Sequence, residues 1–312
     1  MKKYFLILTA IYCIGCSSNR YLQQCQIDGV ESLGKGMVFI GGKFPDAYSR
    51  VNKRLYEVSL MSNLIAIDKA ENYDSTARVI DSFSVVLARI TAQRQHALDG
   101  PKAGWALCLK ITDLLKAIAS PDYAKALADN KEALTTGVDS LVSKYNYGSS
   151  NPVKKGYSGL FSSIALEIGK YKIKQRQKRY FKIAIDSSAP EMYTIIAALR
   201  TIQLQQYTTD IGTVRNDFFT NYRFLNRLRS KVKMDPELAQ KMLTELEQIR
   251  RELIYLETLK THFDKFGENM QNLITALKES VNGKLDCKKI NDIITDLDYL
   301  SGQVEIYSSF LK

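Results

Sequence analysis

The sequence predicts an all-α fold, an elongated helical bundle built on a long antiparallel helical hairpin. Only six prolines and 17 glycines occur in 312 residues, which favours long helices over a β-fold with its many turns. In the C-terminal half, apolar residues recur at alternating spacings of three and four, the period of a helix face that packs on other helices. We therefore expect several long helices, each with one buried face.

The N-terminal half predicts four shorter helices. One apolar face recurs at helical spacing from Val51, and Pro45 with Asp46 would begin that helix. Ser120-Pro121-Asp122 is typical of a helix start, with a capping side chain followed by proline. The expected helices cover residues 45–65, 77–90, 105–118 and a stretch that begins at 120. Together they make an N-terminal helical subdomain, residues 44–146.

The C-terminal half is more regular. Its longest apolar seam consists of Met242, Leu246, Ile249, Leu253, Leu256, Phe263, Met270, Ile274, Leu277 and Val281. A similar seam over residues 211–232 precedes it, and Asp235-Pro236 between them is a second cap-plus-proline start. The chain should therefore fold back as an antiparallel hairpin over residues 190–281, followed by a third seam over 290–311. Short turns favour one intramolecular bundle over an intermolecular coiled coil.

The boundary between these halves is predicted from the stretch 147–156. It is rich in glycine, serine, asparagine and proline, the residues that interrupt helices. We assign it as a linker, and residues 157–312 as a long-helix bundle.

The N-terminus predicts export. Lys2 and Lys3 precede an apolar run of about a dozen residues, which is too short to cross a bilayer that needs about 20 helical residues. The residues that follow, Cys13-Ile14-Gly15-Cys16, resemble the lipobox of bacterial lipoproteins, in which a small residue precedes an invariant cysteine. The resemblance covers residues 1–16 only. It implies removal of a signal peptide, residues 1–15, and acyl chains on Cys16; a plain secretory signal or a buried N-terminal helix is the alternative.

Residues 16–43 are glycine-bearing and polar, with no helical period. We interpret them as a tether between the anchor and the folded part. A flexible chain of this length spans about 25–30 Å on average.

Positive charge is concentrated in one segment. The formal net charge is +11, and residues 149–185 contain nine basic residues against one acid. The densest part predicts anion binding by Lys170, Lys172, Lys174, Arg176, Lys178, Arg179 and Lys182. Basic residues interleaved with tyrosines suit polyanions and, in an interfacial helix, anionic lipid headgroups. For the tyrosines themselves we favour the simpler interpretation that they cap helix seams.

No motif for catalysis or metal binding is recognisable. His96 and His262 are far apart and outside any metal-ligand spacing, and the chain has neither a phosphate-binding loop nor a nucleophile motif. Carboxylates in "TELEQIRRELIYLE" alternate with arginines as on a solvated helix face. We predict no catalytic residue, no metal and no cofactor, although an envelope hydrolase with carboxylates assembled in space stays an alternative.

Three further cysteines, Cys25, Cys108 and Cys287, have no close spacing. An exported protein could pair two of them. The sequence leaves open whether any disulfide forms, and which pair forms it.

The combined expectation is a lipid-anchored protein of the bacterial cell envelope, in the outer membrane facing the periplasm if the cell has two membranes. It would act as a binding or scaffolding module through a basic arm, residues 154–182. The expected partner is anionic lipid, an acidic envelope polymer or an acidic protein, and not nucleic acid. The alternative is a structural subunit of a membrane complex that docks through the 190–281 hairpin.

Overall fold

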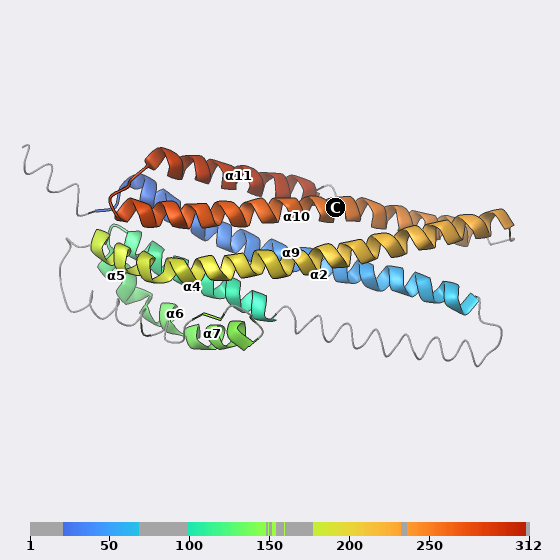
Figure 1. Cartoon of the computed structure of the whole chain (residues 1–312), viewed down its shortest axis with the longest axis horizontal. Helices are drawn as coiled ribbons and strands as arrows, with labels where there is room; N and C mark the ends of the chain where they lie inside the picture. Colours follow the sequence, from blue (N-terminus) through green and yellow to red (C-terminus); the bar gives the residue numbers. More distant parts are fainter. Residues whose placement is uncertain are drawn as a thin grey trace, which may run out of the picture. The chain divides into compact units, whose positions relative to one another are not determined.

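The computed structural model describes residues 21–68, 99–147, 149, 152–153, 159, 177–231 and 236–309. Within these residues there is no strand, and the all-α helical bundle is confirmed. The helices are α2 (Gln24–Asp68), α4 (Asp99–Ala119), α5 (Tyr123–Asp129), α6 (Lys131–Thr135), α7 (Val138–Tyr147), α9 (Gln177–Lys231), α10 (Pro236–Val281) and α11 (Cys287–Ser309) (Figure 1). The helix expected over 77–90 lies outside the described residues.

The chain forms two compact units that interleave along the sequence. The first comprises Met1–Gly41, Lys102–Ala198 and Phe266–Ser301, and the second comprises Gly42–Pro101, Leu199–Lys265 and Gly302–Lys312. The predicted division into subdomains at 44–146 and 157–312 is therefore wrong. The long helices α2, α9, α10 and α11 each contribute residues to both units, so no single cut in the sequence separates them.

The predicted tether is wrong for residues 24–43, which form the first part of α2. Val30, Leu33, Met37 and Ile40 are buried at helical spacing. Gly29 lies so close to α10 and α11 that an added Cβ would stand 3.0 Å from Leu277 and 3.2 Å from Ile290. Glycines that lower helix propensity thus permit close helix packing here, and the burial that results stabilises the helix.

The helix expected over 105–118 is confirmed as α4, which buries most of its length in the first unit. Trp105, Leu107, Ile111 and Leu115 are among its buried side chains. The helix predicted at 120–122 also forms, as the short α5. Pro45, however, lies inside α2 instead of at the start of a helix.

Helices α9 and α10 run antiparallel in each unit, as the predicted hairpin requires (Figure 1). In the first unit the Gln271 amide donates to the Tyr193 carbonyl at 3.3 Å. In the second unit the Tyr207 hydroxyl donates to the Leu256 carbonyl at 3.1 Å. Helix α10 begins at Pro236, the predicted start, whereas α9 begins well before residue 190.

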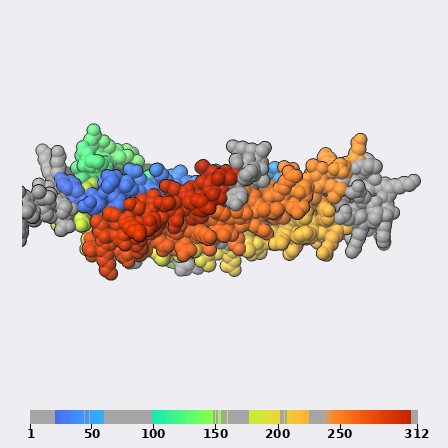
Figure 2. All heavy atoms as spheres, turned by 90° about the horizontal axis from the view of Figure 1, so that it is seen from above, coloured from blue at the N-terminus to red at the C-terminus, as the bar shows by residue number. Residues whose placement is uncertain are grey.

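The predicted C-terminal seams are buried within the chain. Among the α10 seam residues whose burial the structure describes, those from Leu246 to Val281 are all at most 7% exposed. In α11, Ile290, Leu297, Leu300 and Val304 are buried. Figure 2 shows α11 beside the first part of α2 in the first unit. In the part of the chain that the structure describes, no helix combines the length and the apolar character needed to span a membrane.

Candidate functional site

A disulfide closes one end of the first unit. Cys25, in the first turn of α2, is bonded to Cys287, the first residue of α11, with a Cα–Cα distance of 5.5 Å. This distance is normal for a disulfide. Structural disulfides persist in oxidising compartments and are rare in the cytosol. The sequence left the pairing of the cysteines open, and a Cys25–Cys287 disulfide is a bond that suits an exported protein. Cys108 is free and buried.

Buried hydrogen bonds hold the start of α2 against the end of α10. The Gln26 amide donates to the Ser280 hydroxyl at 2.8 Å, and both side chains are about 1% exposed. The Ser280 hydroxyl donates in turn to the Leu277 carbonyl at 2.7 Å. Because these buried groups have partners, the attachment carries no penalty for unpaired polar atoms.

A single glutamine joins three parts of the chain at the same end. The main-chain N–H of Leu22 donates to the Gln177 side-chain oxygen at 3.3 Å. The Gln177 amide nitrogen donates to the carbonyls of Ile118 and Ser120 at 2.9 and 3.0 Å. Gln177 is only 4% exposed, so it fixes the start of α9 to the end of α4 and to the segment before α2.

The turn between α10 and α11 completes this end. The Asn282 amide donates to the Asp186 carboxylate at 3.2 Å, which ties the turn to α9. Gly283 has φ of +94°, a left-handed conformation that favours glycine. Asp286 accepts from the main-chain N–H of Lys289 at 3.0 Å, as a capping residue does. We name the segments 21–26, 177–186 and 280–289 the junction.

The junction carries the part of the predicted basic segment that the structure describes. Arg179 and Lys182 are exposed on the first turns of α9, and Lys178 is half-buried. The other predicted anion-binding residues, Lys170, Lys172, Lys174 and Arg176, lie outside the described residues, as does the predicted lipidation site Cys16.

Sequence distance nevertheless limits how far these residues can be from the junction. Arg176 is the residue immediately before Gln177. Cys16 precedes Tyr21 by five residues, a stretch that reaches at most about 18 Å when fully extended. The segment that follows the expected lipid anchor and the described part of the expected basic arm therefore lie at the same end of the first unit.

Sequence reasoning missed three further cations of the junction, which are exposed at the α10–α11 turn and the start of α11: Lys284, Lys288 and Lys289. The dipeptide Asn282-Gly283 indicated a turn, and the lysines beside it were visible. What the sequence did not contain was the attachment of this turn to Cys25, which is 262 residues away from Cys287.

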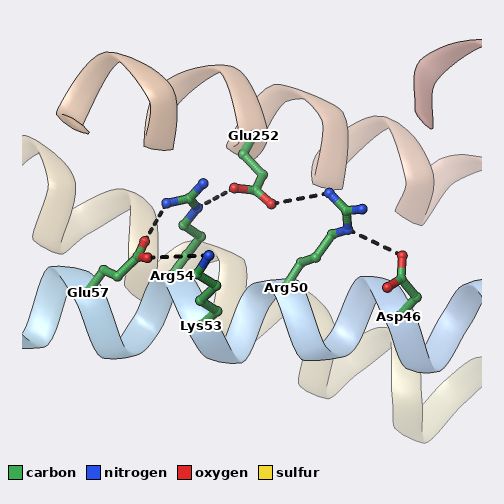
Figure 3. Close-up of polar contacts among 6 residues, drawn as sticks. All are labelled: Asp46, Arg50, Lys53, Arg54, Glu57 and Glu252. Atoms are coloured by element: carbon green, nitrogen blue, oxygen red, sulfur yellow. Dashed lines mark hydrogen bonds and ion pairs between the residues drawn. The ribbon is translucent and has the colours of Figure 1, made fainter. Parts of the chain in front are cut away.

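The second unit contains a buried ion-pair network between α2 and α10 (Figure 3). Glu252 of α10 faces Arg54 of α2 with one carboxylate oxygen and Arg50 with the other, the latter at 3.8 Å. Arg54 also pairs with Glu57, and Arg50 with Asp46 at 3.2 Å. Both oxygens of Glu252 are thus engaged by arginines, which suits a fixed charge better than a general base.

Arg54 stays charged in this network. Burial acts to lower the pKa of Arg54, but the charges and hydrogen bonds of Glu252 and Glu57 together outweigh it, and that pKa is raised. The prediction of a solvated face holds for Glu247, which is exposed and pairs with Arg250 and Arg251. It is wrong for Glu252, which is only 6% exposed.

No other arrangement of described residues suggests catalysis. In this part of the chain, no group of histidine, cysteine and carboxylate side chains could hold a metal ion. His262 Nδ1 lies 2.8 Å from the Thr258 carbonyl one turn earlier, so it donates within its own helix. Burial raises the pKa of the Tyr207 hydroxyl, which donates to a main-chain carbonyl. His96 lies outside the described residues.

Comparisons with known proteins give no family to guide the assignment. No family model matches the chain, and neither a curated protein nor a solved structure is significantly similar to it. The function must therefore be inferred from the junction itself.

Proposed function

We propose that the protein is a lipid-anchored lipoprotein of the bacterial envelope that acts as a binding or scaffolding module. Acyl chains on Cys16 anchor it, and the basic arm, residues 154–182, contacts the anionic headgroups of the same membrane. The observation that carries this proposal is the hydrogen bond from Leu22 to Gln177. It joins the segment that follows Cys16 to the start of α9, which lies within the basic arm.

Charge and reach favour a lipid surface as the anionic partner. The described end of the basic arm, from Gln177, lies beside the segment that follows the proposed acyl anchor, so headgroups are the nearest envelope anions that we expect it to meet. Each Lys or Arg near an anionic membrane surface contributes about 1 kcal/mol. Acyl chains combined with a basic patch give stable attachment. The Cys25–Cys287 disulfide adds support, because it suits an oxidising envelope compartment.

The anchor is tested in cells by labelling with a clickable fatty acid, followed by fractionation. We expect the wild-type chain to be labelled and to sediment with membranes, and Cys16→Ala to lose the label and to be partly released. A Cys16→Ala chain that is still labelled would overturn the assignment of Cys16.

The basic arm is tested with the purified Cys16→Ser chain, which lacks the anchor, on vesicles of anionic phosphatidylglycerol or neutral phosphatidylcholine. A triple variant, Arg176→Gln, Arg179→Gln and Lys182→Gln, should bind anionic vesicles roughly a hundredfold more weakly, if each charge contributes about 1 kcal/mol. The matched control removes three exposed cations of the second unit, Arg223, Lys241 and Lys265, and should bind nearly as wild type.

Salt dependence gives an independent reading of the same contact. Binding that depends on exposed charges weakens as ionic strength rises, because the Debye length shortens to about 8 Å at physiological salt.

If the control triple weakens binding as much as the arm triple, overall charge and not the arm controls attachment. Retention by an acidic polymer or protein with no vesicle binding would transfer the arm's role to that partner.

A second candidate function, docking into a membrane complex through the hairpin, is favoured by three exposed apolar side chains. Phe219 and Tyr222 of α9 are 48% and 41% exposed, and Ile254 of α10 is 59% exposed. Burial of the described seam residues counts against it, since the seam is already occupied within the chain. Crosslinking in cells with Phe219→Ser and Tyr222→Ser distinguishes the two, because only docking through the hairpin predicts the loss of a crosslinked protein.

A further inference from the structure

We infer that the α10–α11 turn, Asn282–Asp286, is a second membrane contact, in which Leu285 inserts among lipid headgroups and Lys284 and Lys288 bind their phosphates. The inference rests on the proposed lipid anchor and names a surface outside the basic arm. Its occupant is the anionic phospholipid surface that holds Cys16.

Leu285 is an apolar side chain that the bundle leaves partly exposed. It is 43% exposed in a turn whose backbone is fixed by Gly283 at positive φ. Lys284 precedes it directly, and Lys288 follows three residues later; both are exposed. An apolar residue flanked by lysines suits a membrane interface, where the apolar group enters the acyl boundary and the cations meet headgroups.

A disulfide and a hydrogen bond hold this turn at the end of the first unit where Tyr21 and Leu22 lie. Cys287, two residues after Leu285, is bonded to Cys25. Leu22, three residues before Cys25, is bonded to Gln177 of α9. Tyr21, which is 48% exposed and lies just before Leu22, adds an aromatic side chain with a polar hydroxyl to this end of the unit.

The charges of the junction are divided in a way that favours an external anion. Its two acids have partners within the chain: Asp186 accepts from the Asn282 amide, and Asp286 accepts from the main-chain N–H of Lys289 at 3.0 Å. The Lys289 ammonium pairs with Glu279, just before the junction, at 3.2 Å. Among the described residues, no acid forms an ion pair with the exposed cations Arg179, Lys182, Lys284 and Lys288. These cations therefore remain available to headgroup phosphates.

A membrane fits this surface better than a free phosphate does. A free anion would use the lysines and gain nothing from Leu285, because that side chain has no polar group. Insertion of a leucine into an apolar layer is favourable by an amount that scales with the area removed from water. An exposed leucine beside two exposed lysines thus indicates contact with both the apolar layer and the headgroups of a membrane.

The test uses the full acylated chain in anionic vesicles that contain brominated lipids, which quench tryptophan at the membrane. Leu285→Trp should be quenched, with emission shifted to shorter wavelength. Tyr299→Trp is the matched control, a 64% exposed position farther along α11, and should not be quenched. Trp105, which is 5% exposed, contributes the same background to both.

Sedimentation of the same samples separates the two proposals. If neither variant sediments with vesicles, the anchor proposal fails. If both sediment and the tryptophan at position 285 stays unquenched, the turn does not contact lipid and this inference is overturned while the anchor stands. An effect of Lys284→Gln and Lys288→Gln confined to crosslinked proteins would equally overturn it in favour of a protein partner.

A second variant keeps the inference testable without tryptophan. In the Cys16→Ser chain, Leu285→Asp should weaken binding to anionic vesicles by roughly three- to tenfold. Part of the free energy of transferring leucine out of water is lost, and a negative charge is brought to a negatively charged surface. Equal affinity of Leu285→Asp and its parent would contradict insertion.

Discussion

Cys25 and Cys287 are bonded to each other across 262 positions and join the first turn of α2 to the first residue of α11. Reduction of this bond should lower the free energy of unfolding of the chain. Removing a native disulfide typically costs about 2–5 kcal/mol, because the unfolded chain regains the freedom of the closed loop. Urea unfolding followed by circular dichroism, with and without reductant, measures the difference.

The control for this prediction is the double variant Cys25→Ala and Cys287→Ala. It should unfold at a lower urea concentration than the oxidised wild type and should not respond to reductant. Equal midpoints for oxidised and reduced wild type would show that the bond adds no stability.

Gly104→Ala should destabilise the first unit even though alanine favours helices. An added Cβ would stand 2.9 Å from the Tyr145 ring and 3.2 Å from Ile195, so α4 would have to move away from α7 and α9. Such overpacking costs about 1–3 kcal/mol. Thermal unfolding of the purified variant measures it.

Gly42→Ala is the matched control in the interior of α2. Nothing lies within 4 Å of its added Cβ, so the substitution should stabilise the chain by about 0.5–1 kcal/mol. If both alanines raise the melting temperature, the close approach at Gly104 is not a packing constraint.

Glu252→Leu should strongly destabilise the second unit, because it leaves Arg54 buried with one acidic partner fewer (Figure 3). Breaking a buried pair by removing one partner costs about 3–5 kcal/mol. Glu57 still pairs with Arg54, so we expect the lower end of that range. Adding Arg54→Met to Glu252→Leu should recover much of the loss, since two apolar side chains then replace two charges.

The comparison for this pair is Glu247→Gln on the same helix. Glu247 is exposed and pairs with Arg250 at 3.5 Å, and such surface pairs contribute about 0–1 kcal/mol. The measurement is the urea midpoint of Glu252→Leu, of Glu247→Gln, and of the double variant that combines Glu252→Leu with Arg54→Met. A loss for Glu252→Leu no larger than that for Glu247→Gln would contradict a structural role for the network.

The helices of the C-terminal half were predictable because their period is long and uninterrupted. Leu246, Phe263 and Leu277 repeat one face of α10 over eight turns or more, and a face of that length has to be buried. Residues 24–43 were not predictable in the same way. Gly29, Gly34 and Gly36 argue against a helix by propensity, and only the partner helices show why glycine is there.

The junction could be predicted in its charges but not in its assembly. Arg179 and Lys182 belong to a basic run that any charge count detects. Leu22 and Gln177 are 155 residues apart, and no local pattern records a hydrogen bond between them. Three cysteines allow three pairs, so the bond between Cys25 and Cys287 also required the structure.

Asp113→Asn should make the chain more stable at neutral pH, by an amount that shrinks as the pH falls. Burial raises the pKa of Asp113 in α4, against the smaller opposing effect of Lys116 and Lys110. The folded state therefore binds this proton more tightly than the unfolded state. The cost of the ionised carboxylate is fully present above the folded pKa and is relieved as the pH falls towards the ordinary aspartate pKa of about 3.9. The urea midpoints of wild type and Asp113→Asn, measured between pH 4 and 7, should converge at the acid end. The control is Asp129→Asn, at an exposed position, which should change the free energy of unfolding by no more than about 0.5 kcal/mol. A constant difference across that range would show that the effect of Asp113→Asn does not arise from titration.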